Sequence, residues 1–575
     1  MFNAHPRSFK AYADALWEKY APFYDQLESY ALTPDTLHDW MSGWSWVAEL
    51  LGEVSSRLYV FYAQNTTDET AEKRYFAYLE NIQPHAKAAD QKLTVKLLES
   101  GLVPAGMEIP VQRMRVDAEI FRDENLPLFT EERKLASEYE KIAGAWTVQW
   151  EGEEHTLTGL IPTYQAAARA TREHIWRAAA ARRLTDRVAI NDLWTKMLAL
   201  RVQIAENAGF SDYRAYRWQE FHRFDYTPDE NESFLRAIEQ VVVPAATRIY
   251  AKRAQRLGIG TLRPWDLDLD QGVYPFQFPP LTPFTDVAEL DARSAVIFHQ
   301  VDPQLGAYYT EMQHKEMLDL GNRKGKGPGA FCTYYPLAES PFIFGNAVGT
   351  HDDVQMLLHE AGHAFHAFEA MGLPYLPQRF TGSEFAEVAS MGMELLAAPY
   401  LAADQGGFYS PQDAARARAE HLERGILFWP YMAVVDAFQH WAYTHIGEAQ
   451  DPTHRDAKWA ELWTRFIPGV DWRGLDDMRA TGWHRKVHIH TYPFYYVEYG
   501  LAQLGAVQVW GNALRDQAGA VAAYRRALAL GGTASLPELF KAAGARFAFD
   551  AETVGAAVGL MERVINKLES ASGSV

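Results

Sequence analysis

The sequence predicts a mainly α-helical protein with a small β element, and three observations support this prediction. The first part of the chain repeats apolar residues at helical spacing in one segment after another. A glycine-rich segment at residues 322–336 is followed by "SPFIFGNAVGT", which has the pattern of a short strand and a turn. From Gly349 onward helical patterns continue to near the C-terminus. Because 575 residues exceed one ordinary core, we expect two lobes.

The N-terminal lobe is expected to span residues 1–195. In the segment "TTDETAEKRYFAYLENI", apolar residues at helical spacing predict a helix, and Thr66 and Glu69 predict a capping box at its start. The segment "WTVQWEGEEHTLTGLIP" interrupts the helices with two alternating runs around Gly152. This pattern predicts a β-hairpin near residues 146–160.

The second domain is expected to span residues 196–569, with a small β element before the helix that carries residues 356–369. The last residues, 570–575, read "SASGSV", a polar tail that we expect to fray. No internal repeat divides the chain further.

Composition and charge limit the classes of partner. The chain has 55 Lys and Arg against 74 Asp and Glu, a net charge of -19, which disfavours nucleic acid and anionic membranes as partners. Its single cysteine, Cys332, excludes an intrachain disulfide framework and is typical of a reducing compartment. The N-terminus has no secretory apolar stretch, and the apolar run at residues 426–435 is too short to span a membrane. We expect a cytoplasmic protein.

The segment "MLLHEAGHAFHAFE" carries a candidate metal site. His359 and His363 are four residues apart and therefore project from the same helix face, where two imidazoles can bind one zinc ion. Glu360 follows the first histidine and is placed to accept a proton from an attacking water. The alternative is that these are ordinary packed or surface histidines.

A third ligand is needed, and the segment "GSEFAEVASMGMELLAAPY" supplies three glutamates. Glu387 and Glu394 are seven residues apart and share a helix face with Met391. Acids on such an apolar face are costly to bury unless they are paired or coordinated. This favours one of them as a ligand and the other as its supporting partner, whereas Glu384 suits the N-terminal turn of the helix.

These motifs together resemble a known family. "HEAGHAFH" followed by "FAEVASMGMELL" is similar to the thimet oligopeptidase / oligoendopeptidase F family of zinc metallopeptidases, and the oligoendopeptidase F branch in particular. The resemblance extends over about residues 262–510. It implies that His359, His363 and Glu387 hold one Zn²⁺ per chain and that Glu360 is the general base.

The resemblance also implies a fold and a substrate class. Members have two helical lobes that enclose a deep channel, with a small β-sheet next to the zinc-binding helix, and they act on short peptides. His366 belongs to the family pattern and is expected either to support the ligands or to pack. The strand "SPFIFGNAVG" is expected to be an edge strand, either purely structural or offering its edge to an extended peptide, with Phe344 and Gly345 in contact with substrate.

Downstream, "HRKVHIHTYPFYYVEYGLAQ" is rich in tyrosine and histidine. Pro493 suits the first turn of a helix, which would place Tyr495, Tyr496 and Tyr499 in its first two turns. Tyr496 and Tyr499, three residues apart, would then share one side of the helix. An aromatic stripe at this spacing is ordinarily part of a core.

A peptide-bond hydrolase offers a further reason for these residues, because phenol and imidazole groups can stabilise an oxyanion. In the family, a histidine and tyrosines downstream of the zinc motif have this role. The resemblance matches His488 to the histidine and Tyr492, Tyr496 and Tyr499 to the tyrosines, with His490 as the alternative histidine. We expect His488 and Tyr496 to be catalytic and the other two tyrosines to contact substrate.

The sequence therefore favours a cytoplasmic zinc endopeptidase that hydrolyses internal bonds of short oligopeptides. A zinc carboxypeptidase or dipeptidase of similar helical fold is the second interpretation. A catalytically silent peptide-binding protein is the third. Neither nucleic acid nor a membrane is expected as a partner, and the oligomeric state is open.

Overall fold

The computed structural model describes residues 8–160, 168–267 and 280–572. These residues are mainly helical, with one two-stranded and one three-stranded sheet, which confirms the predicted fold class. The chain forms two compact units, and it passes through each of them three times. The first unit comprises Met1–Glu119, Leu281–Ala414 and Gly505–Phe547, and the second comprises Ile120–Pro280, Ala415–Leu504 and Ala548–Val575. This interleaved arrangement differs from the predicted division after residue 195.

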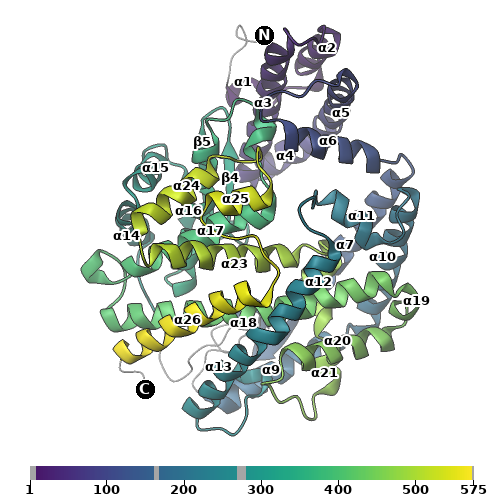
Figure 1. Ribbon diagram of the computed structural model, residues 1–575. Coiled ribbons are helices and arrows are strands. Elements are labelled where there is room, and N and C mark those ends of the chain that lie inside the picture. The colour runs from purple at the N-terminus through teal and green to yellow at the C-terminus, as the bar shows by residue number, and fades with distance from the viewer. Residues whose placement is uncertain (1–7, 161–167, 268–279, 573–575) are drawn as a thin grey trace. The chain divides into compact units, whose positions relative to one another are not determined.

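The first unit contains the three-stranded sheet and the helices around it (Figure 1). Its main elements are α1 (Phe9–Tyr12), α2 (Ala21–Ser29), α3 (Leu37–Gln64), α4 (Glu69–Asn81), α5 (Gln83–Ser100), α14 (Val287–Val301), α15 (Pro303–His314), β3 (Leu318–Gly321), β4 (Phe331–Tyr335), β5 (Ser340–Ala347), α16 (His351–Ala370), α17 (Ser383–Ala397), α24 (Gln517–Leu528) and α25 (Leu536–Ala542).

The second unit is helical apart from the hairpin of β1 (Thr147–Trp150) and β2 (Glu153–Thr156), which confirms the predicted hairpin. Its other main elements are α7 (Asn125–Gly144), α9 (Arg169–Leu184), α10 (Arg187–Asn207), α11 (Tyr213–Glu220), α12 (Pro228–Ala237), α13 (Val243–Arg256), α19 (Ile446–Ala449), α20 (Pro452–Phe466), α21 (Asp476–Ala480), the 3₁₀ helix η8 (Gly482–Arg485), α22 (Val487–Thr491) and α26 (Ala551–Ser572). Three helices contain a boundary between units: α6 (Glu108–Ile120), α18 (Pro411–Thr444) and α23 (Tyr496–Ala513).

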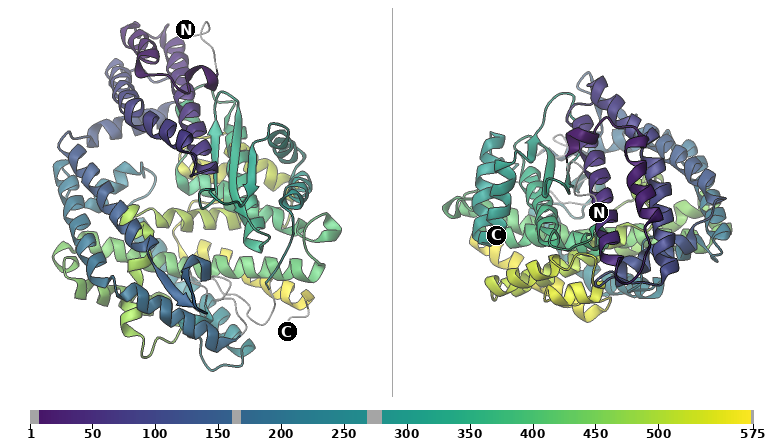
Figure 2. Two further views of the ribbon diagram at one scale, coloured as in Figure 1. Left: turned by 180° about the vertical axis from the view of Figure 1, so that it is seen from behind. Right: turned by 90° about the horizontal axis from the view of Figure 1, so that it is seen from above.

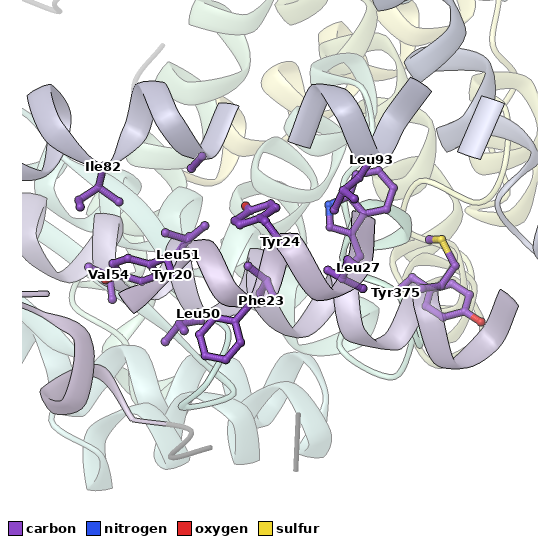
Figure 3. Packing of buried hydrophobic residues seen from close by; sticks show 14 of the residues in the cluster. Tyr20, Phe23, Tyr24, Leu27, Leu50, Leu51, Val54, Ile82, Leu93 and Tyr375 are labelled. Carbon is purple, nitrogen blue, oxygen red and sulfur yellow. The ribbon is translucent and has the colours of Figure 1, made fainter. Parts of the chain in front are cut away.

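An aromatic and aliphatic core holds the N-terminal helices of the first unit together (Figure 3). Phe23 and Leu27 of α2 pack with Leu50 and Val54 of α3, and Leu93 of α5 completes the cluster. All five side chains are almost fully buried. Burial of each stabilises the fold by about 1.5–3 kcal/mol.

The helix predicted from the "TTDETAEKRYFAYLENI" segment is α4, but its cap differs from the prediction. The side chain of Asp68 accepts the backbone N–H groups of Thr70 and Ala71, so Asp68 is the N-cap. The predicted capping box of Thr66 and Glu69 is therefore wrong, because the helix begins two residues later than that box requires.

The three-stranded sheet has the order β3-β5-β4. β5 is the central strand, parallel to β3 and antiparallel to β4 (Figure 2, left). The predicted edge strand at "SPFIFGNAVG" is therefore wrong in both of its forms, because both edges of β5 are paired and seven of its eight residues are buried. Among the described residues, the strand with one neighbour next to α16 is β4.

Two further expectations concern the chain's ends and membranes. α26 extends to Ser572, so the predicted frayed tail begins inside a helix, and residues 573–575 lie outside the described residues. Within the described ranges, every helix is too short or too polar to cross a bilayer.

Candidate metal centre and catalytic residues

The start of α16 is fixed immediately after β5. Thr350 caps the helix in a capping box with Asp353. The Asp353 carboxylate also accepts the backbone N–H groups of Val348, Gly349 and Thr350 at 2.7 to 2.9 Å. Gly349 has a φ of +102°, a conformation that favours glycine. The turn therefore sets the position of every residue that follows on the helix.

α16 and α17 lie side by side and approach each other closely at Gly362, between the two predicted ligand histidines (Figure 1). A Cβ at Gly362 would lie 2.5 Å from the carbonyl oxygen of Ala389 and 2.6 Å from the Cα of Ser390. Only glycine permits this backbone contact. The contact brings the carboxylates of α17 to the histidine face of α16.

The three predicted ligands meet at this contact. The Oε2 atom of Glu387 lies 3.3 Å from Nε2 of His359 and 3.6 Å from Nε2 of His363. One potential ligand atom from each residue lies within 4.8 Å of the other two. Among the described residues, these three form the one group of this kind.

This geometry fits a tetrahedral metal ion. Two ligand atoms bound at about 2.0–2.1 Å to one tetrahedral ion lie roughly 3.3–3.4 Å apart, close to both observed separations. Two imidazoles and one carboxylate are also the donor set of many catalytic zinc sites, in which the fourth position stays open. The residues present therefore fit a bound zinc ion.

Two further side chains hold the ligands in place. Oε1 of Glu394 lies 2.6 Å from Nδ1 of His359, on the opposite side of the ring from Glu387. A carboxylate on the far nitrogen fixes the ring and raises its basicity as a ligand. The hydroxyl of Ser390 donates to Oε2 of Glu387 at 2.7 Å. The sequence predicts Glu394 as a supporting partner, whereas Ser390 was not predicted.

Glu360 is 8% exposed and lies beside the ligand set. Burial raises its pKa to about 7, against the attraction of His359 and with a further rise from the charge of Glu387. The backbone N–H of Cys332, in β4, hydrogen-bonds to its carboxylate and lowers the pKa. Glu360 therefore has a fixed orientation and a pKa suited to accepting and releasing a proton near neutral pH.

The ligand residues also shift one another's pKa values. Burial lowers the pKa of His363 to about 4, which favours the neutral imidazole that a metal requires. Burial would lower the pKa of His359 as well, but hydrogen bonds to Glu387 and Glu394 raise it well above its ordinary value. Burial raises the pKa of Glu387, and its interactions with the two histidines outweigh that effect and lower it. The Glu387 carboxylate and the two imidazoles therefore interact strongly at one point, where a bound cation would take the place of the proton shared between them.

His366 lies one turn further along α16 and is not one of the three clustered ligands. Its ring packs edge-on against Phe385 of α17, with 6.2 Å between centroids. Burial lowers the pKa of His366 to about 4. His366 therefore packs against α17, which is one of the two roles expected for it.

Phe344 and Gly345 do not lie on an open surface. The ring of Phe344 is 0% exposed and stacks on Phe331 at 4.8 Å between centroids. A Cβ at Gly345 would lie 2.7 Å from Cε of Met356 in α16. Their predicted contact with substrate rested on an exposed β5 edge, so that reasoning is wrong.

In the second unit, the predicted histidine and two of the tyrosines form a cluster. The ring of His488, in α22, lies 4.9 Å from that of Tyr496 and 6.3 Å from that of Tyr499, centroid to centroid. Tyr496 and Tyr499 are 5.8 Å apart in the same measure. Tyr496 is 7% exposed, whereas His488 and Tyr499 are half-buried. We call these three residues the imidazole–phenol cluster.

The backbone before the cluster differs from the prediction. α23 begins at Tyr496, so the proposal that Pro493 occupies its first turn is wrong. Phe494 instead has a φ of +67°, which strains a non-glycine residue. Its N–H donates to Gln439 at 2.8 Å and its carbonyl accepts from Arg223 at 2.6 Å. These two buried side chains hold the turn that orients Tyr496.

The other two candidates lie outside the cluster. Tyr492 is 61% exposed and lies on the wall of a separate pocket together with Arg217. His490 is 0% exposed, and its ring stacks on Tyr139 with 3.9 Å between centroids and on Trp483 at 5.7 Å. Of the two alternative histidines, the half-buried one is His488.

The family model and the solved structures that resemble this chain are described as peptidases. A family model described as peptidase family M3 matches residues 163–557. The structure of PZ peptidase A with an inhibitor is 25% identical, with a TM-score of 0.85, and the match covers 97% of this chain and 99% of that chain. An X-ray structure assigned to oligoendopeptidase F is 26% identical, with a TM-score of 0.85 and coverage of 97% and 98%.

A further structure, assigned to oligoendopeptidase F from Bacillus anthracis str. Ames, is 23% identical with a TM-score of 0.80 and shares the fold. It covers 98% of both chains. A comparison with curated protein sequences finds no match. The family model and the similar structures confirm the resemblance predicted from the motifs.

Proposed function

The chain belongs to peptidase family M3, and from that premise we propose that it is a zinc-dependent endopeptidase that hydrolyses internal bonds of short oligopeptides. One Zn²⁺ per chain would be held by His359, His363 and Glu387. The observation that carries the proposal is the separation of 3.3 and 3.6 Å between the Glu387 carboxylate and the two imidazole nitrogens. The substrate class follows from the similarity to PZ peptidase A and to oligoendopeptidase F.

In the proposed reaction, a bound metal ion would act as a Lewis acid and a glutamate side chain would transfer the proton. Bound zinc supplies a Lewis acid that polarises the scissile carbonyl and acidifies water. Glu360 accepts the proton of the attacking water and later gives it to the leaving amine. Its burial and its hydrogen bond from Cys332 support this assignment. Glu394 holds the imidazole of His359 in the tautomer that a ligand requires.

The imidazole–phenol cluster is proposed to stabilise the oxyanion. His488 and Tyr496 would donate hydrogen bonds to the oxygen that becomes negative as water adds to the carbonyl. Tyr499 would contact the substrate beside them, and the exposed Tyr492 would contact a more distant part of the peptide. This assignment rests on the rings that surround His488 and on the family resemblance.

Substrate backbone is proposed to pair with β4 in place of β5. Among the described residues β4 has a single strand neighbour, and it contacts α16. The N–H of Cys332, the second residue of β4, is directed to Glu360. An extended peptide along this edge would place its carbonyl groups beside the general base.

The composition of the chain supports a proposal for its location and for the partners that it does not bind. The net charge of -19 and the single cysteine support a cytoplasmic enzyme with neither nucleic acid nor membrane as partner. Short peptides are its proposed partners.

A panel of peptides with both ends blocked, graded in length, tests the reaction. An endopeptidase cleaves them internally, whereas a carboxypeptidase or dipeptidase needs a free terminus and a silent binder cleaves none. A chelator should abolish cleavage, and one equivalent of zinc per chain should restore it. Cleavage that persists in the metal-free protein, or that begins only when a terminus is unblocked, would contradict the proposal.

A further inference from the structure

A group of aromatic side chains in the first unit lies beside β4 and takes no part in the candidate metal centre. It consists of Tyr59 and Tyr62 of α3 and Tyr75 and Phe76 of α4, two helices that pack side by side (Figure 1). Neighbouring rings contact one another, with centroids 5.6 to 6.0 Å apart. We call these four residues the aromatic patch.

Much of the aromatic patch is open to solvent. Tyr59 is 39% exposed and Phe76 is 43% exposed, while Tyr62 and Tyr75 are half-buried. Single exposed aromatic residues are ordinary on a protein surface, whereas contiguous ones indicate a binding surface. Tyr62 and Tyr75 are also stacked, with an angle of 16° between their planes. The rings therefore support one another and form a preformed apolar surface.

The hydrogen bonding of the sheet shows which backbone groups of β4 point away from β5. The N–H of Ile343 donates to Met317, directly before β3, and Ile343 is the residue paired with Cys332. In an antiparallel pair, such a residue and its partner are not hydrogen-bonded to each other. The N–H and C=O of Cys332 therefore point to the outer edge of the sheet, as do those of Tyr334. The contact of the Cys332 N–H with Glu360 agrees with this direction.

The side chains of Phe331 and Thr333 point to the face of the sheet that α3 covers. The hydroxyl of Thr333 lies 3.2 Å from a serine hydroxyl of α3, and the ring of Phe331 lies 5.3 Å from that of Tyr59, centroid to centroid. Gln64, about 140° around α3 from Tyr59, instead reaches Asp319 of β3. Tyr59 is therefore on the side of α3 away from β3. There it overhangs the outer edge of β4.

We propose that the aromatic patch and Phe331 together form a subsite for a bulky apolar side chain, and an aromatic one above all, of the peptide substrate. The inference rests on the proposed function, in which an extended peptide pairs with β4. Residues that lie directly opposite each other on paired strands point to the same face of the sheet. A peptide residue opposite Phe331 therefore directs its side chain to Tyr59. Because Cys332, the next residue of β4, contacts Glu360, this peptide residue lies within two residues of the cleaved bond.

The rings determine the class of side chain that gains most from the subsite. Phenylalanine buries apolar area against Tyr59 and Phe331 and makes edge-to-face or offset contacts with them. The methyl group of alanine reaches few of these atoms. Burial of the larger side chain corresponds to a preference for phenylalanine over alanine of about tenfold or more.

The test uses alanine-based peptides with both ends blocked, in which a single phenylalanine is moved along the chain. Mass spectrometry of the products locates the cleaved bond. In the wild-type chain, the cleaved bond should follow the phenylalanine at a fixed offset of at most two residues, and kcat/KM should exceed that of the all-alanine peptide by about tenfold or more. Tyr59→Ala should remove most of this preference and spread the cleavage over several bonds. Tyr59→Phe keeps the ring and should keep both.

Phe61→Ala is the matched control. Phe61 is also an aromatic residue of α3 that is 39% exposed, but it packs against Phe9 of α1 on the other side of the helix. Each preference is a ratio of two peptides on one variant, so a change in stability or in total activity cancels. Equal losses in Y59A and F61A, or an unchanged preference in Y59A, would overturn the proposal.

Binding measurements separate this inference from the proposed function. The affinities of the phenylalanine and all-alanine peptides for Glu360→Gln are measured by calorimetry. Tighter binding of the phenylalanine peptide, together with no cleavage by the wild-type chain, would contradict the peptidase reaction and support the subsite. Cleavage at bonds unrelated to the phenylalanine would contradict the subsite alone. If the aromatic patch instead binds a second copy of the chain, Y59A changes the molar mass in light scattering and leaves the peptide preference intact, which also overturns the subsite.

Discussion

The two candidate groups of catalytic residues are built in different ways. The candidate metal ligands of the first unit stand on two long, regular helices, α16 and α17, where residue spacing fixes the direction of each side chain. The imidazole–phenol cluster of the second unit stands on the short helix α22, an irregular turn and the first two turns of α23. Spacing along the sequence is therefore a good guide to the first group and a poor guide to the second.

The difference extends to what holds each group. In the first unit a missing side chain, at Gly362, lets the two helices touch. In the second unit, side chains hold the backbone instead: Gln439 and Arg223 hydrogen-bond to the strained turn at Phe494. Arg223 is itself paired with Glu498 at 2.7 Å in the interior. Backbone strain at a candidate site is consistent with a functional role.

The largest effect on activity is expected from Glu360→Gln, which changes the first group alone. The amide side chain introduced at position 360 cannot accept a proton from water, so kcat/KM should fall by about 10²–10⁴-fold. The three ligands are untouched, so zinc content by elemental analysis should stay at one per chain. Loss of zinc from E360Q would place Glu360 among the ligands, and unchanged turnover would remove it from the mechanism.

The second-largest effect on activity is expected at Tyr496. It tests whether the imidazole–phenol cluster takes part in the same reaction as the candidate metal ligands. Tyr496→Phe removes one hydroxyl and should lower kcat by about 10²–10³-fold with little change in KM, as expected for a group that binds the transition state. Tyr492→Phe is the matched control, since this tyrosine is 61% exposed and lies outside the cluster. Equal effects of the two variants, or a change in KM alone, would assign Tyr496 to the core or to ground-state binding.

A smaller effect, on zinc affinity, is expected from Gly362→Ala, which changes none of the three candidate ligands. The added methyl would meet backbone atoms of Ala389 and Ser390 at 2.5–2.6 Å, so α17 must move away from α16. Zinc affinity should fall by about 10–100-fold, the range seen when ligand support is lost. Gly372→Ala is the control, because a Cβ there meets nothing within 4 Å. Competition with a fluorescent chelator measures both affinities, and equal values would contradict the packing argument.

Much of the geometry of the candidate metal centre could be predicted from the sequence, because helical periodicity converts spacing into geometry. His359 and His363 face the same way at i and i+4, and Glu387 and Glu394 do so at seven residues apart. The glycine between the histidines was a usable signal that was not used: a small residue on a ligand-bearing helix indicates the close approach of a second helix.

Other features had no signal in a single sequence. β5 has the length and apolar character of either a central or an edge strand, and only the pairing with β3 and β4 decides. The start of α23 was misplaced because Pro493 favours a first helical turn, whereas long-range contacts from Arg223 and Gln439 stabilise a different backbone. Tertiary contacts of this kind override local preference.

The last prediction concerns stability and leaves the candidate catalytic residues unchanged: Asp319→Asn tests how the sheet beside α16 is held. Asp319 accepts hydrogen bonds from Arg323, Lys326 and Gln64, and the Lys326 ammonium also donates to the carbonyl oxygens of Gly321 and Gly345. Burial raises the pKa of Asp319, but these donors outweigh it and lower the pKa to about 2.

A carboxyl group whose pKa is lowered by folding stabilises the native state above its unfolded pKa, and the stabilisation is lost as pH falls toward the folded pKa. Asp319→Asn should therefore lower the free energy of unfolding by about 1–2 kcal/mol at pH 7, after allowance for solvent screening. The difference from the wild-type chain should persist down to about pH 4 and narrow below it, because the ordinary pKa is 3.8. Urea midpoints measured from pH 7 to pH 3 check this, with the exposed Asp404→Asn as control. A difference that stays constant to pH 3 would show that packing, rather than the charge of Asp319, holds the sheet.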